Sequence, residues 1–119
     1  MEFDNLNIWK KGYELVICVY EVTSNYPKEE RYGLVNQTRR AANSIIALIA
    51  ESHGRYSFAD KIRVLYQARG EAIEVRSHLK VAHGLGFLLE GDYDSLDNEY
   101  KRLSAGINAY IKSISKHKK

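Results

Sequence analysis

Apolar residues recur every three or four positions over four long segments of the chain, which is the spacing of one face of an α-helix. The segments cover about residues 7–25, 32–53, 57–83 and 90–115. Pro27 follows the first segment and Gly54 the second, and both residue types commonly end helices. Ser57, followed three residues later by Asp60, resembles a capping box at the start of the third segment. The pattern therefore predicts four helices of similar length joined by short links.

Such a succession is typical of an all-α, antiparallel up-down-up-down four-helix bundle. The chain has 119 residues, enough for one domain with its own core, so residues 1–119 are assigned to a single domain with 116–119 as a basic tail. The one cysteine, Cys18, lies among apolar residues, and we expect it to fill space in the core. A lone cysteine fits a reducing compartment, and no run is long enough to span a membrane. We expect a cytoplasmic protein.

The second segment contains a stretch without any charge, from Ala41 to Ala50, whose apolar side chains point in every direction. A helix that is apolar all round is buried, and a small chain has no large core to surround it. We therefore expect a second subunit to cover this helix, and the protein to be the protomer of a ring. The residues predicted to form the subunit contact are Trp9, Arg40, Ser44, Ala47 and Glu51. The alternative is a partly solvated helix edge.

The formal net charge is only +3, which does not by itself indicate a nucleic-acid-binding protein. An antiparallel bundle, however, would gather cations at one end and acidic residues at the other. The basic end is a candidate surface for a phosphate backbone. Its predicted binding residues are Arg55, Lys61, Arg63, Lys112, Lys116 and Lys118. The alternative is that these charges serve solubility, and for Arg39 and Arg40 both a structural and a binding role stay open.

No pattern in the chain matches a metal-ligand cluster, a phosphate-binding loop or a nucleophile elbow. We therefore expect no metal, no cofactor and no enzymatic activity. One catalytic alternative rests on Arg76 and His83, which resemble the Arg-x(4–6)-His signature of the HEPN ribonucleases and lie on one helical face. Ser77 departs from that signature, because an Asn, His or Asp usually follows the arginine.

Several longer motifs together carry a family resemblance. They are Leu6-x-Ile8-Trp9-Lys10, Tyr26-Pro27-Lys28-Glu29-Glu30-Arg31-Tyr32-Gly33-Leu34, Gln37-x-Arg39-Arg40-Ala41-Ala42-x-Ser44-Ile45, Ile49-Ala50-Glu51-x-x-Gly54-Arg55 and Leu85-Gly86-Phe87-Leu88. The chain resembles the "four helix bundle protein" family encoded in intervening sequences of bacterial 23S rRNA genes. It is also similar to the accessory variability determinant protein of diversity-generating retroelements. It departs from the family pattern at Leu48 and Ser52, which replace an Asn and a Gly, and at Glu71, which replaces a Ser.

The resemblance implies a homopentameric ring of four-helix protomers with a positively charged surface or channel and no catalytic role. In the retroelement branch, the ring binds RNA and the reverse transcriptase. The predicted function is thus that of a non-catalytic oligomeric scaffold that binds nucleic acid, RNA or DNA, through its basic end. The alternatives are a protein–protein adaptor that binds no nucleic acid and a HEPN-like ribonuclease.

Overall fold

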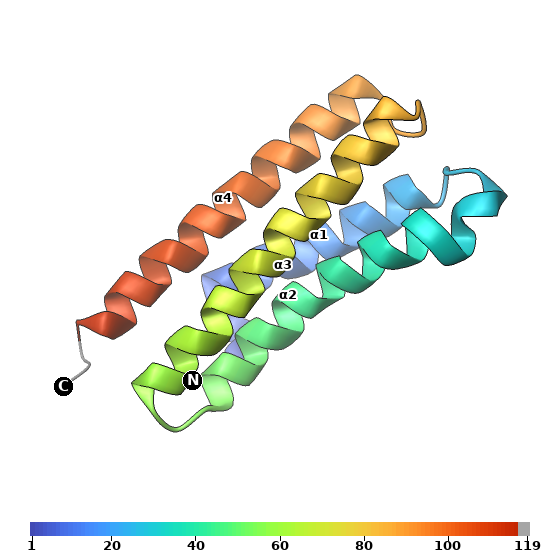
Figure 1. Ribbon diagram of the computed structural model, residues 1–119. Helices are drawn as coiled ribbons and strands as arrows, with labels where there is room; N and C mark the ends of the chain where they lie inside the picture. Colours follow the sequence, from blue (N-terminus) through green and yellow to red (C-terminus); the bar gives the residue numbers. More distant parts are fainter. Residues whose placement is uncertain (117–119) are drawn as a thin grey trace.

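The computed structural model describes residues 1–116 and contains four long helices in that range. They are α1 (Asn7–Thr23), α2 (Asn36–Gly54), α3 (Phe58–Gly84) and α4 (Glu90–Ser115). A short 3₁₀ turn, Phe3–Asn5, precedes α1. Successive helices run in opposite directions (Figure 1). The predicted all-α fold and its up-down-up-down order are confirmed.

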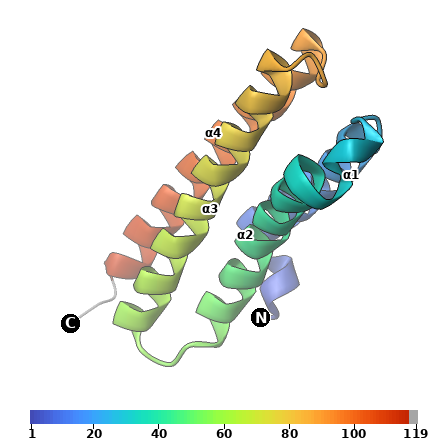
Figure 2. The same ribbon diagram turned by 45° about the vertical axis from the view of Figure 1, so that its right-hand side comes forward.

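Each helix packs against its two neighbours in the chain's order, and α1 also packs against α4, so α1 and α3 lie at diagonal corners. The α2–α3 contact is the most extensive and the α1–α4 contact the least. Figure 2 shows the α1–α2 pair beside the α3–α4 pair. The core between them is continuous and includes the fully buried Val19, Ile49, Leu65, Leu79 and Ile107. In residues 1–116, no helix combines the length and apolar character needed to cross a membrane.

The helix ends agree with the sequence pattern except at the first link. The hydroxyl of Ser57 accepts a hydrogen bond from the Asp60 amide at 3.1 Å, which confirms the predicted cap of α3. The start of the second helix is displaced, because Gly33 has a backbone conformation (φ −110°, ψ −108°) that no α-helix contains. A 3₁₀ turn (Lys28–Glu30) and a π-helical turn (Arg31–Val35) therefore precede α2.

The prediction that Cys18 fills the core is wrong, because its side chain is exposed. Residues 15–20 are all apolar, but a helix turns through 100° per residue and cannot bury six consecutive side chains on one face. Leu15, Val16 and Val19 face the core, while Ile17 and Cys18 face outward. Partial burial and the nearby carboxylate of Glu21 raise the pKa of the Cys18 thiol, which keeps it protonated at neutral pH.

The apolar stretch of α2 does not by itself require a second subunit to cover it, so the subunit contact stays a prediction. The helix is covered on two sides, as expected, but both covers come from its own bundle. Ile45 and Ile49 are buried, and Ile46 and Leu48 are half-buried against the same core. Between Ala41 and Ala50 only Asn43 and Ala47 are exposed, so α2 presents no large apolar side chain to solvent. Of the four helices, α1 and α3 carry the large exposed apolar side chains.

Candidate functional site

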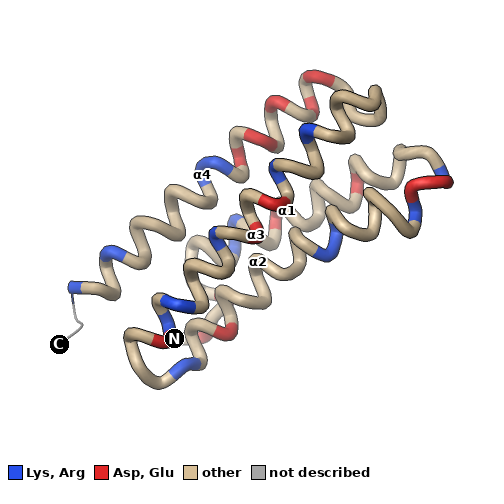
Figure 3. The backbone as a smooth tube through the Cα atoms, in the orientation of Figure 1, with Lys and Arg blue, Asp and Glu red and all other residues tan. Residues whose placement is uncertain are grey.

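The antiparallel topology gathers the first turns of α1 and α3 and the last turns of α2 and α4 at one end of the bundle. Figure 3 shows Lys and Arg in the last turns of α4 at this end and Asp and Glu in its first turns at the other, with further Lys and Arg along the middle of the helices. Of the predicted binding residues, Arg55, Lys61, Arg63, Lys112 and Lys116 all lie at this end. Lys118 lies outside the described residues. The arrangement follows from helix order alone, since each cation belongs to a terminal turn that the topology brings there.

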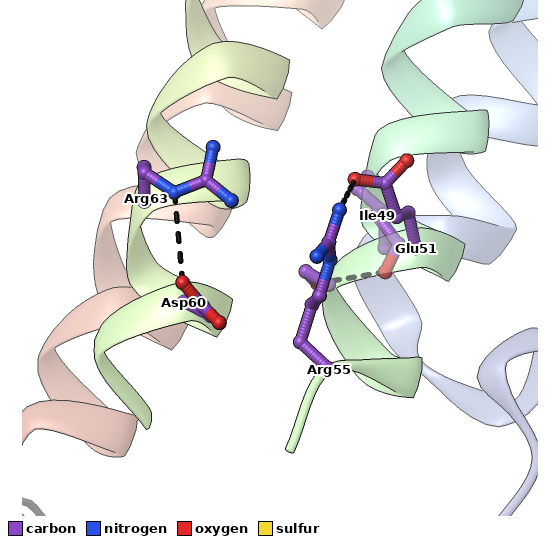
Figure 4. A network of polar contacts seen from close by, with 6 residues as sticks. Ile49, Glu51, Arg55, Asp60 and Arg63 are labelled. Atoms are coloured by element: carbon purple, nitrogen blue, oxygen red, sulfur yellow. Dashed lines mark hydrogen bonds and ion pairs between the residues drawn. The ribbon is translucent and has the colours of Figure 1, made fainter. Parts of the chain in front are cut away.

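Two of these cations already have acidic partners on the same surface (Figure 4). Arg55 Nη2 lies 2.9 Å from Glu51 Oε2, and this hydrogen bond and charge raise the pKa of the guanidinium. Arg63 Nε lies 3.7 Å from Asp60 Oδ1. Exposed ion pairs of this kind contribute little to stability, because water screens both charges. Both guanidinium groups can therefore exchange a carboxylate for a phosphate at small cost.

Lys61 has a structural role that the sequence did not indicate. Its ammonium donates hydrogen bonds to the main-chain oxygens of His53 at 2.9 Å and Ser52 at 3.3 Å. These carbonyls belong to the last turn of α2, where a cation satisfies free acceptors and opposes the helix dipole. Lys61 therefore fastens the start of α3 to the end of α2, and its charge is partly used inside the subunit.

At the basic end, three cations make neither an ion pair nor a side-chain hydrogen bond among residues 1–116: Lys112 and Lys116, near the end of α4, and Lys10, in the first turn of α1. All three are exposed. The next residue, Lys11, differs from them because it pairs with Glu99 of α4. The freely available positive charge of the basic end is thus concentrated where α1 begins and α4 ends.

Four of the predicted subunit-contact residues, Arg40, Ser44, Ala47 and Glu51, lie on one face of α2, and the fifth, Trp9, lies on α1. Trp9 stacks on Tyr13 with ring centroids 5.3 Å apart, and together with Ala47 it lines a shallow apolar groove of about 330 Å³ between α1 and α2. Ser44 is half-buried. Glu51 is paired with Arg55. The structure therefore places the four predicted α2 residues along one outward-facing row, with Trp9 of α1 beside Ala47.

Arg40 lies in a second, polar groove of about 310 Å³ between α2 and α3. Glu74 and His78 of α3 share that groove. Burial and the charge of Glu74 raise the pKa of the neighbouring Glu71, against the opposing effects of Arg40 and His78. Arg40 is exposed and makes no ion pair in the described part of the chain, so a binding role stays open for it.

Arg39, in contrast, is structural. Its Nε donates to the Thr23 hydroxyl at 2.9 Å, and Nη2 donates to the Tyr20 carbonyl oxygen at 3.3 Å. The guanidinium lies 4.4 Å from the centroid of the Tyr20 ring. These contacts fix the end of α1 to α2 and leave little of Arg39 for an external ligand.

The two residues of the ribonuclease alternative both have partners in the packing of α3 against α4. Arg76 Nε donates to Asp97 Oδ1 at 2.8 Å. The His83 ring stacks on Tyr93 with centroids 4.7 Å apart, and its Nδ1 lies 3.3 Å from the Leu88 carbonyl oxygen. Stability of the helix pair therefore accounts for the positions of Arg76 and His83.

The Glu74–His78 pair does not form part of a metal site within residues 1–116. His78 Nε2 lies 3.8 Å from Glu74 Oε2, but the described residues contain no group of three or more His, Cys, Asp or Glu side chains placed to hold a metal ion. The pair is a surface contact within α3.

Comparison with known proteins places this bundle in a family. A crystal structure of a protein of unknown function from the S23 ribosomal protein family of Bacteroides thetaiotaomicron is similar, with 24% identity, a TM-score of 0.82, and coverage of 92% of this chain and 98% of that one. At that identity the likeness shows the fold. No curated protein matches the chain. Residues 4–109 match the model of the 23S rRNA-intervening sequence proteins. Because this match covers all four helices, the chain belongs to the 23S rRNA-intervening sequence protein family.

Proposed function

We propose that the protein is a non-catalytic, homo-oligomeric helical scaffold that binds RNA through the basic end of its bundle. The observation that carries this proposal is the separation of charge between the two ends (Figure 3). At the basic end, Lys10, Lys112 and Lys116 are exposed and make no ion pair in residues 1–116. Phosphate binding by such residues needs no dedicated pocket, because it draws on net charge and the release of counterions.

Assembly would strengthen this surface. The exposed apolar side chains of α1 and α3 are a surface of the kind that marks protein–protein contacts. A ring, which the family resemblance implies to be a pentamer, would place the same end of every subunit on one face. Several weak phosphate-binding surfaces held together gain affinity through effective concentration. The small net charge of one subunit is then sufficient for the assembly to bind RNA.

The choice of RNA rests on the family, which takes its name from intervening sequences of 23S rRNA. A cytoplasmic location fits this proposal, because the exposed thiol of Cys18 stays reduced there. The same basic end could also serve a protein partner, and the salt dependence of binding separates the two cases, since counterion release makes RNA binding strongly dependent on salt.

The proposal is tested by light scattering coupled to size exclusion, with absorbance at 260 and 280 nm, followed by titration of a structured RNA at several salt concentrations. We expect an oligomer that retains RNA at low salt. The double variant Lys112→Glu/Lys116→Glu should bind RNA more weakly, with a salt slope smaller by about 1–2 because the slope falls by roughly 0.9 per lost phosphate contact. The oligomer mass should not change.

The matched control is Lys28→Glu/Arg31→Glu, which makes the same change of charge at the acidic end. Its affinity for RNA should stay close to that of the wild type. Equal losses in both double variants would show that only net charge matters and would remove the basic end as the site. A clean protein spectrum with no salt-dependent binding would favour the adaptor without nucleic acid.

A further inference from the structure

Helices α1 and α3 each leave a row of apolar side chains uncovered in the single subunit. On α1 the row is Tyr13, Ile17 and Tyr20, which are 49%, 46% and 42% exposed. On α3 the row contains Tyr66 and Ile73, which are 47% and 56% exposed. Neither row contains a charged residue. Two half-exposed apolar rows on one small domain are more than scattered surface hydrophobics, which need no explanation.

Gly70 lies in the middle of the α3 row, and nothing within the subunit accounts for it. A glycine inside a helix is less favourable than alanine, because it loses more backbone freedom on folding. A Cβ built at Gly70 meets no atom within 4 Å. Gly12 of α1 is different, since a Cβ there would come within 2.5 Å of Ile46 Cγ2. The absence of a side chain at Gly70 therefore leaves a notch on the outer surface of α3.

The two rows have the same spacing. Tyr13, Ile17 and Tyr20 are separated by four and three residues, as are Tyr66, Gly70 and Ile73. Laid side by side in parallel, the rows place the Ile17 side chain opposite the notch at Gly70. The large residues on either side of Ile17 then meet the large residues on either side of Gly70.

The rows also lie at similar heights along the bundle, because both helices pack on α2 and run in the same direction. The α1–α2 contacts include Tyr20 with Asn43 and Thr23 with Arg39. The α2–α3 contact of His53 with Lys61 fixes the level of α3. By these contacts with α2, Ile17 lies close to the level of Gly70, whereas the contacts through α4, Ile8 with Gly106 and Asp97 with Arg76, place it nearer to Arg76. A rotation about an axis inclined to the bundle brings the two rows together.

The charges that border the rows are complementary. Glu14 and Glu21 border the α1 row, are exposed, and make no ion pair among the described residues. Arg69 and Lys80 border the α3 row; Lys80 is exposed, whereas Arg69 donates to Asn108 Oδ1 at 2.7 Å and lies 4.7 Å from the centroid of the Tyr66 ring. At 100° per residue, these two borders face each other when the helices are parallel and the rows are in contact. Opposite charges at the edge of an apolar contact set its register and exclude wrong partners.

We propose that the α3 row of one subunit binds the α1 row of the next, with Ile17 seated over Gly70. This inference rests on the homo-oligomer of the proposed function and names the surfaces that build it. Because α1 and α3 lie at diagonal corners, the contact joins two different faces, and repeating it produces a closed ring or an open filament. Trp9, one turn before Tyr13, borders this contact, whereas the predicted α2 residues lie outside it.

The contact is tested by disulfide cross-linking in a Cys18→Ser background, which removes the exposed native thiol. Ile17→Cys and Gly70→Cys are co-expressed on separate chains and oxidised mildly. A covalent dimer, at twice the 13.7 kDa of one chain, is expected only when both cysteines are present. A chain that carries both cysteines should form covalent trimers and larger oligomers as well as dimers. Gly91→Cys replaces Gly70→Cys as the control, because Gly91 also has open space around it, and it should give no dimer.

Two results would overturn the proposed contact. Cross-linking of Gly70→Cys alone would mean that α3 pairs with α3, and an oligomer without the mixed cross-link would mean that another surface builds it. In the second case, the oligomer of the proposed function would stand while the contact fails. If light scattering shows that the wild-type protein is a monomer, both the oligomer of the proposed function and the proposed contact are refuted. As an independent measurement, Gly70→Leu should abolish the oligomer, whereas Gly91→Leu should leave its mass unchanged.

Discussion

The approach of α1 to α2 at Gly12 can be tested by a single added methyl group. In Gly12→Ala the new Cβ would lie 2.5 Å from Ile46 Cγ2, which is too close for two carbon atoms that are not linked through bonds. Ile46 is β-branched and stiff at χ1, so it cannot turn this methyl away and keep its rotamer. Either Ile46 or the two helices must shift, and such overpacking costs about 1–3 kcal/mol.

The added methyl group also brings a gain, because alanine is favoured over glycine in a helix by about 1 kcal/mol. When this gain is subtracted from a cost near the middle of the overpacking range, the free energy of unfolding of Gly12→Ala is expected to be about 1 kcal/mol lower than that of the wild type. For a chain of 119 residues this corresponds to a fall in Tm of about 4 °C. The gain and the cost can be measured separately, since only the cost depends on Ile46.

The assay is a double-mutant cycle with Ile46→Ala, which removes Cγ2, followed by circular dichroism during urea unfolding. In the Ile46→Ala background, Gly12→Ala should be neutral or stabilising by up to about 1 kcal/mol, which gives a coupling energy of about 1–2 kcal/mol. All four proteins must be compared at one concentration, because assembly makes stability depend on it. If Gly12→Ala has the same cost in both backgrounds, the proposed contact with Ile46 is not its cause.

Three further changes test other contacts of the subunit. Arg76→Ala leaves the Asp97 carboxylate, only 13% exposed, with Lys101 at 3.6 Å as its remaining ion pair in residues 1–116. We expect the free energy of unfolding, measured in urea, to fall by about 2 kcal/mol. An unchanged unfolding midpoint would contradict this. Ser57→Ala removes the N-cap of α3 and should lower the free energy of unfolding by about 1 kcal/mol. A Tm equal to that of the wild type in calorimetry would show that the cap does not stabilise the fold. The hydrogen bond from Lys11 lowers the pKa of Glu99, so this carboxylate stabilises the fold above its unfolded pKa of about 4.3 and stops doing so as pH falls through its folded value. The Tm of Glu99→Gln should therefore fall less than the Tm of the wild type between about pH 5 and pH 3. Equal falls in Tm for the two proteins would argue against the Lys11–Glu99 contact.

The helices were predictable because their signals are local. Apolar periodicity and the Ser57 cap depend on residues within one or two turns, and the predicted fourth helix, 90–115, has the bounds of α4. The first link was not predictable in the same way. Gly33 permits the turn that precedes α2 without requiring it, and the Glu30 carboxylate that accepts a hydrogen bond from the Leu34 amide at 3.3 Å becomes visible only in three dimensions.

The candidate site was predictable in its location but not in its details. Helix order alone places Arg55, Lys112 and Lys116 at one end. Which cations are already engaged depends on contacts between helices, such as that of Lys61 with the carbonyls at the end of α2. Neighbouring residues with identical side chains can therefore differ in role, as Arg39 and Arg40 do.

The comparison of α2 with α3 shows why apolar periodicity alone does not locate a subunit contact. Periodicity reports how many sides of a helix are apolar, but only the packed subunit shows which sides stay uncovered. Gly70 gives this point a measurable consequence. In dilute monomer, Gly70→Ala should stabilise the subunit by about 1 kcal/mol, because the helix gains alanine and its Cβ meets no atom. In the assembly, the same methyl group fills the notch that receives Ile17 and should weaken association. If Gly70 has no role in assembly, Gly70→Ala should change the free energy of unfolding of the monomer but not the free energy of association. If Gly70 receives Ile17 of a neighbouring subunit, the same change should make the monomer more stable and the association weaker.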